Sequence, residues 1–136
     1  MKAIATYQIA KWAEEPYASI SNEIKLTKTS ATFVFSGHLQ GNATVEYLMY
    51  YGHFEAKNPY ASSADYVGLI QFVGRLNGRM GTFVMEDRGT FREGVSTSVL
   101  KIIPQSGMND LEGIFGTGQY TANSDGCEFE LNFEYR

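Results

Sequence analysis

The chain has 136 residues, a net charge of −4, 43% hydrophobic residues and 19% charged residues, which predicts one globular domain over residues 1–136. The acidic balance argues against a nucleic-acid partner, because phosphate recognition needs a positive field. No stretch approaches the roughly 20 apolar residues of a membrane helix, so we expect no membrane partner. The N-terminus lacks a secretory signal and the single Cys127 cannot form an internal disulfide, so we expect a cytoplasmic protein.

The first half of the chain is rich in Thr, Val and aromatic residues, which predicts three strands, at residues 3–12, 25–38 and 43–51. Glu14-Glu15-Pro16 and the Ser and Asn residues after it predict a loop over residues 13–22. Gln40-Gly41-Asn42 predicts the turn between the second and third strands. Residues 52–64 form the longest irregular piece, a length typical of lids and binding loops.

The strongest local signal is Asn77-Gly78, which predicts a two-residue type I′ hairpin turn inside residues 66–91. The turn sets Leu76 opposite Arg79 and fixes which residues share a face. Large apolar residues then alternate with glycine on the face that we assign to the interior, which consists of Tyr66, Gly68, Ile70, Phe72, Gly74, Gly81, Phe83, Met85, Asp87 and Gly89. This alternation suits a tightly curved inner wall, on which Asp87 is the one charged residue.

The last third of the chain continues the pattern with strands at residues 95–103, 111–120 and 127–135. Glu93-Gly94 and Ser124-Asp125-Gly126 predict tight turns, and residues 104–110 predict a loop. The chain therefore reads as all-β, with about eight antiparallel strands in a closed barrel or a sandwich. The glycine placement favours the barrel, whose interior is either filled with side chains or open to one small ligand.

Glu46 is the first candidate for chemistry. A two-residue turn at Gln40-Gly41 would set Phe35 opposite Glu46 and Phe33 opposite Leu48, whereas an odd-length loop would swap the faces. On this interpretation Glu46 and Tyr50 share the inner face with the two phenylalanines. A carboxylate among aromatic side chains has a raised pKa and can exchange protons. The alternative is that Glu46 faces water or pairs with a lysine.

Asp87 is the second candidate, placed opposite Gly68 near one end of the barrel. Glu46 and Asp87 inside one barrel would form an acid/base pair, whereas a solvated position at the rim would leave Asp87 without such a role. Glu86 and Lys101 are expected to face each other on the outer face as an ion pair. His38 and His53 lack partners at ligand spacing, so we expect no metal site.

The chain also resembles a known family along nearly its whole length. The matching segments are Trp12 with Glu14-Glu15-Pro16-Tyr17, Lys25-Leu26-Thr27-Lys28, Val45-Glu46-Tyr47-Leu48, Tyr66-Val67-Gly68-Leu69, Gly78 to Val84, Gly89-Thr90-Phe91, Ile103-Pro104, Ser106-Gly107 and Leu111-Glu112-Gly113. They resemble a small bacterial family of domains of unknown function, grouped with barrels like allene oxide cyclase. The resemblance implies an eight-stranded antiparallel barrel and a homo-oligomer, but no particular reaction.

The leading hypothesis is a protein that binds a small, largely apolar molecule inside the barrel without a cofactor. Its expected lining is Phe33, Phe35, Glu46, Leu48, Tyr50, Tyr66, Phe72 and Phe83, with Glu46 as the polar anchor. A second hypothesis is an isomerase or cyclase that uses Glu46, with Tyr50 or Asp87, for acid/base catalysis. A third is a structural homo-oligomer with a filled barrel.

Overall fold

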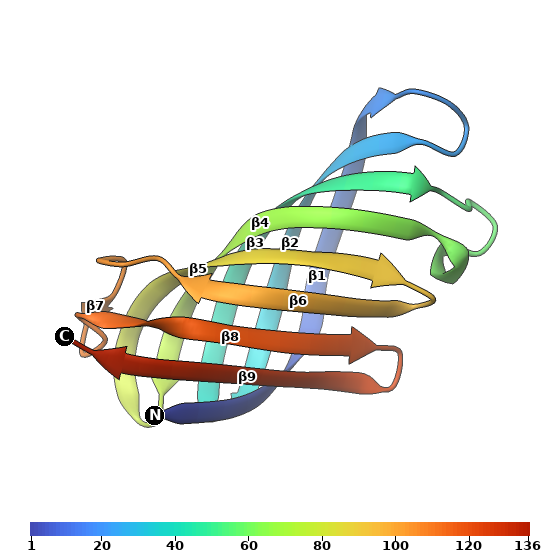
Figure 1. Cartoon of the computed structure of the whole chain (residues 1–136). Coiled ribbons are helices and arrows are strands. Elements are labelled where there is room, and N and C mark those ends of the chain that lie inside the picture. The colour runs from blue at the N-terminus through green and yellow to red at the C-terminus, as the bar shows by residue number, and fades with distance from the viewer.

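The computed structural model describes residues 1–136 as one sheet of nine antiparallel strands, eight of which close into a ring (Figure 1). The strands are β1 (Lys2–Ser19), β2 (Lys25–Gly37), β3 (Leu39–His53), β4 (Ser63–Leu76), β5 (Arg79–Arg92), β6 (Val95–Ile102), β7 (Met108–Asn109), β8 (Ile114–Asn123) and β9 (Gly126–Tyr135). The order around the ring is β1-β2-β3-β4-β5-β6-β8-β9, and β9 pairs with β1. The predicted all-β, eight-stranded antiparallel architecture is confirmed.

The two ends of the ring differ in what covers them. One end carries the β1–β2, β3–β4, β5–β6 and β8–β9 connections; we call it the open end, and it lies to the right and top of Figure 1. The opposite, closed end carries the β2–β3 and β4–β5 turns, strand β7 and both termini. The one helical element is the short 3-10 turn η1 (Pro59–Ala61) at the open end, and no helix has the length and apolarity to cross a membrane.

The β4–β5 hairpin forms as its turn signal predicts. Leu76 pairs with Arg79, and Asn77 and Gly78 have φ values of 49° and 85°, the positive φ that a type I′ turn needs at both positions. The register places Gly68 opposite Asp87, which is fully buried. Glu86 also pairs with Lys101 across β5 and β6, as expected, but their charged groups do not come within 4.0 Å.

Replacing Gly78 tests how much this turn contributes to stability. A Cβ at Gly78 would meet nothing within 4 Å, so Gly78→Ala acts only through the positive φ. We expect it to lower the free energy of unfolding by about 1–2 kcal/mol in a urea titration. Gly52→Ala is the matched control, because Gly52 has no positive φ and its Cβ would make only an ordinary contact with Tyr50. Equal stabilities for the two variants would contradict the argument.

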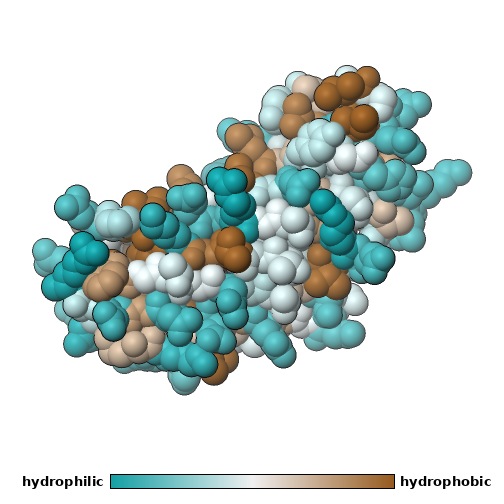
Figure 2. All heavy atoms as spheres, in the orientation of Figure 1, coloured by the Kyte–Doolittle hydropathy of each residue, from teal (hydrophilic) through white to brown (hydrophobic).

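The interior of the closed half is filled. Phe35, Phe72, Phe83 and Phe129 are at most 3% exposed, and Phe72 lies 5.8 Å from Phe35 and 5.4 Å from Phe83 between ring centroids. Aliphatic residues complete this core, among them Leu39, Leu76, Leu111, Ile114 and Leu131. The side chains on the outer face are mixed: hydrophilic ones cover much of the surface in Figure 2, with apolar ones between them.

Two sequence-based expectations about local structure in the first half of the chain are wrong. Residues 13–19 of the segment predicted as a loop are strand, because β1 continues to Ser19 by pairing with β2 through irregularities between Ile9 and Lys11 and between Pro16 and Ala18. Only residues 20–22 are irregular as expected. The chain does not turn at residues 40–42 but reverses around His38, after Gly37 with a φ of 103°. Gly41 lies within the sheet instead, opposite Gly74, where a side chain on either residue would collide with the partner strand's carbonyl oxygen.

The different turn changes which β3 residues face the interior. Phe33 pairs with Ala43 and Phe35 with Gly41, so the register differs from the expected one by an odd number of residues. Side chains alternate along a strand, and the odd shift therefore turns Glu46, Leu48 and Tyr50 outward. Leu48 and Tyr50 are 51% and 41% exposed, and the Glu46 carboxylate accepts hydrogen bonds from the Ser30 hydroxyl at 2.9 and 2.7 Å.

Candidate functional site

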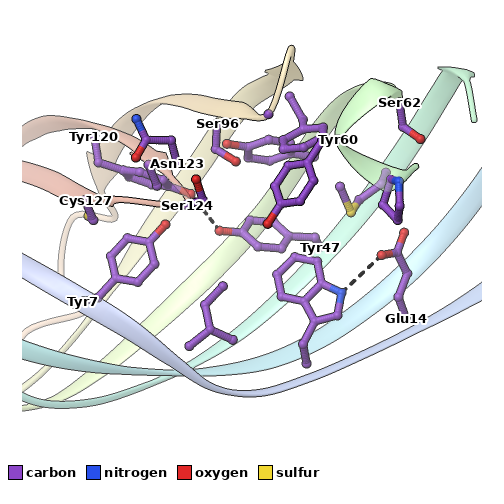
Figure 3. A pocket seen from close by; sticks show the side chains of 18 of the residues that line it. Tyr7, Glu14, Tyr47, Tyr60, Ser62, Ser96, Tyr120, Asn123, Ser124 and Cys127 are labelled. Carbon is purple, nitrogen blue, oxygen red and sulfur yellow. Dashed lines mark hydrogen bonds between the residues drawn. The ribbon is translucent and has the colours of Figure 1, made fainter. Parts of the chain in front are cut away.

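The open half of the ring encloses a cavity of about 750 Å³ (Figure 3). More than half of its lining is hydrophobic, and its aromatic members come from seven parts of the chain: Tyr7, Trp12, Phe33, Tyr47, Tyr51, Phe54, Tyr60, Tyr66, Phe91 and Tyr120. Inward positions of β3, which hold Tyr47, Met49 and Tyr51, supply one wall. The predicted irregular segment 52–64 supplies another part of the lining through Phe54, Pro59, Tyr60 and Ser62.

The cavity extends along the side of the ring where β1 separates from β9. β1 and β9 pair through four residue pairs only, from Lys2 to Ala5, and β1 then leaves β9 (Figure 1). Tyr7, Gln8, Ile9 and Trp12 on β1 and the segment 123–127 on the β8–β9 hairpin line the cavity on the two sides of this separation. Pro16 fits in β1 because this part of the strand is an edge, where a missing N–H removes no ladder bond on the free side.

Asp87 lies beneath the cavity in a compact polar cluster. Its Oδ2 accepts hydrogen bonds from the hydroxyls of Tyr47 at 2.7 Å and Tyr120 at 2.9 Å, and these two hydroxyl oxygens are 3.0 Å apart. Asp87 Oδ1 is buried without a partner. Tyr47 and Tyr120 line the cavity while Asp87 does not, so the two tyrosines separate the carboxyl group from the cavity.

The protons in this cluster can be counted. Three oxygen atoms make three mutual contacts, and an ionised Asp87 leaves only the two tyrosine protons to fill them. A protonated Asp87 supplies the third proton. Its Oδ2–H then donates to one tyrosine hydroxyl instead of accepting from it, and the other tyrosine still donates to Oδ2, which closes a ring of three hydrogen bonds. It also leaves Oδ1 as a neutral oxygen, which costs less to bury unpartnered than a carboxylate oxygen.

Burial shifts the pKa values of these groups in the same direction. It raises the pKa of Asp87 above its ordinary value, and the hydrogen bonds from the hydroxyls of Tyr47 and Tyr120 offset only part of that rise. Burial also raises the pKa of Tyr47 and of Tyr120, so both phenols stay neutral donors at physiological pH. The floor of the cavity is therefore a set of uncharged hydroxyl groups.

Glu14 forms a second polar centre, in the wall of the cavity rather than below it. Its Oε2 accepts hydrogen bonds from Tyr51 at 2.6 Å and Thr27 at 2.7 Å, and its Oε1 accepts one from the Trp12 indole N–H at 3.2 Å. Glu14 is half-buried, and no basic group lies within 4.0 Å of it. The three donors come from β1, β2 and β3, so this carboxylate is held in place by the sheet itself.

The structure brings together only part of the predicted site. Phe33 and Tyr66 line the cavity, whereas Phe35, Phe72 and Phe83 belong to the filled core at the closed end. Glu46, Leu48 and Tyr50 lie outside the ring, so the expected inner-face position of these three residues is wrong. Asp87 is inside as predicted, but the pair of Glu46 with Asp87 does not form because the two lie on opposite faces of the sheet.

The sequence reasoning missed Tyr47, Tyr120 and Glu14. The expected β2–β3 turn places Glu46 inside and therefore places its neighbour Tyr47 outside, and Gly37, with a φ of 103°, is the signal that corrects this turn. Glu14 lay inside the segment predicted as a loop. Burial raises the pKa of the Cys127 thiol, which also lines the cavity, to about 11, so this thiol is protonated at neutral pH and a weak nucleophile. No three His, Cys, Asp or Glu side chains are placed to hold a metal ion.

Fold and site together define a class of protein: a ring of eight antiparallel strands, filled at one end and hollow and aromatic at the other. The model of a family described as "Protein of unknown function (DUF3224)" matches residues 3–135, and the chain belongs to this family. The chain is similar to a crystal structure of a protein of unknown function from the DUF3224 family of Shewanella oneidensis MR-1. The two share 26% identity with a TM-score of 0.81, over 100% of this chain and 97% of that one.

A search of curated proteins finds no match to the chain. The expected membership of a bacterial family of unknown function is confirmed by the family model and by the structural neighbour. The narrower likeness to allene oxide cyclase and the expected homo-oligomer stay predictions.

Proposed function

We propose that the protein binds a small, largely apolar molecule in the cavity at the open end. The observation that carries the proposal is the cavity itself, whose volume of about 750 Å³ lies in the range of small-molecule sites. Its walls are mainly aromatic, with the few polar groups concentrated at the Asp87 cluster and at Glu14. This combination of apolar walls and few fixed polar groups is typical of sites that bind by shape and orient by hydrogen bonds.

The division of the interior also supports binding rather than a purely structural role. The closed half already contains the packed core that stabilises the fold. In the open half, large side chains such as Tyr7 and Phe33, which stack at 4.2 Å between centroids, surround space instead of filling it. An eight-stranded ring is just wide enough for one small ligand in such a position.

A titration with the neutral fluorescent probe N-phenyl-1-naphthylamine tests the proposal. We expect saturable enhancement of probe emission and a matching change in the emission of Trp12, the single tryptophan, which lines the cavity. Ala122→Phe places a ring in the cavity and should weaken probe binding by about tenfold or more. Ala13→Phe, at an exposed position outside the cavity, is the control and should bind as the native protein does. Probe binding that is absent, or unaffected by Ala122→Phe, would overturn the proposal.

A further inference from the structure

We propose that the cavity selects apolar ligands that carry a positive charge, such as an aryl or alkyl ammonium ion, and seats the cation beside Glu14. This inference rests on the proposed function, because it names the class of ligand for the same cavity. It starts from the acidic and basic side chains of the lining: the acidic ones are Glu14 and Asp125, and no Lys, Arg or His lines the cavity.

Hydrogen bonds from the protein hold the Glu14 carboxylate in one position, unlike a carboxylate on the surface. Buried Thr27 and Tyr51 donate to Oε2, and Trp12 donates to Oε1, so the carboxylate stays in one orientation. A carboxylate offers about four acceptor positions, and these three bonds leave one of them free. Its charge has no counter-ion within 4.0 Å in the protein, so a ligand can supply one.

The aromatic side chains around Glu14 favour the same ligand. Trp12 and Tyr51 bond directly to its carboxylate, and the Tyr47 ring lies 6.4 Å from the Trp12 ring between centroids. Figure 3 shows Glu14 across the cavity from Tyr7 and Cys127, with Tyr47 and Tyr60 between them. Faces of Trp and Tyr attract cations, and of the three rings those of Tyr47 and Tyr51 are buried while that of Trp12 is partly open to solvent.

One basic side chain at the open end shows that an aromatic ring of the lining can hold a cation. The Lys25 ammonium lies 4.2 Å from the centroid of the Phe54 ring at the open end. Lys25 does not line the cavity and does not reach Glu14. An anionic ligand would instead meet Glu14, the rim residue Asp125 and a chain with a net charge of −4.

Three competitors of matched shape test the inference by displacing N-phenyl-1-naphthylamine from the cavity: benzyltrimethylammonium, its neutral isostere neopentylbenzene, and 3-phenylpropanoate. We expect the cation to compete about tenfold more strongly than the neutral isostere, and the anion to compete least. Glu14→Gln should reduce the ratio of cation to neutral affinity to near one. Glu15→Gln, at the exposed neighbouring position, should leave the ratio as it is in the native protein.

Salt dependence gives a second measurement that needs no variant. Raising NaCl from about 0.05 to 0.5 M should weaken displacement by the cation and leave displacement by neopentylbenzene unchanged. Equal competition by cation and neutral isostere, or an unchanged ratio in Glu14→Gln, would overturn the inference while the proposed function stands. A protein that does not bind the probe at all would overturn the proposed function instead.

Discussion

Phe72→Ala is expected to lower the free energy of unfolding by about 3–5 kcal/mol, measured by urea titration. Phe72 is fully buried at the closed end, in contact distance of the rings of Phe35 and Phe83. Truncation removes a whole ring from a filled core, so the protein loses both the transfer free energy of the ring and the contacts of the atoms around the new void.

The neighbouring residue on the same strand provides the control. Val73 points outward and is 50% exposed, so Val73→Ala should change the free energy of unfolding by less than about 0.5 kcal/mol. Similar losses at the two positions would contradict both the assignment of faces in β4 and the description of the closed end as packed.

The fold could be predicted from the sequence where a turn signal is local. Asn77-Gly78 carries its own backbone requirement, and pairing outward from it gave the correct face for Tyr66, Phe72 and Asp87. The β2–β3 turn has a weaker signal, the single Gly37 with a φ of 103°, and the nearby Gly41 offers a competing position for the turn. The structure shows that Gly41 is glycine because of its close approach to Gly74 and not because of a turn.

The candidate site was harder to predict because its members meet only when the ring closes. Asp87, Tyr47 and Tyr120 come from β5, β3 and β8, and no spacing along the chain connects them. The position of Glu14 also depends on contacts between strands rather than on its local sequence. The composition of its segment favours a loop, but pairing with β2 extends β1 through it, and tertiary contacts thereby override the local preference.

The stability of the protein should depend on pH through Asp87. Burial raises the pKa of Asp87 in the folded state above its ordinary value of about 3.8, which applies in the unfolded chain. Between these two pKa values the folded state holds one more proton than the unfolded state. The free energy of unfolding then falls as pH rises, at up to about 1.4 kcal/mol per pH unit for this one group.

Asp87→Asn removes this titration and keeps a neutral side chain of the same shape beside Tyr47 and Tyr120. Below pH 3.8 both proteins are neutral at this position. The free energy of unfolding of the native protein, relative to that of Asp87→Asn, is therefore at its highest there. This difference in free energy of unfolding is expected to fall as pH rises and to become constant above the folded-state pKa of Asp87. Urea titrations of both proteins from pH 4 to 8 measure the difference. Asp110→Asn, at an exposed carboxylate, is the control and should show no such trend. If the free energies of unfolding of Asp87→Asn and of the native protein change with pH in parallel, Asp87 is ionised in the folded protein and the prediction is wrong.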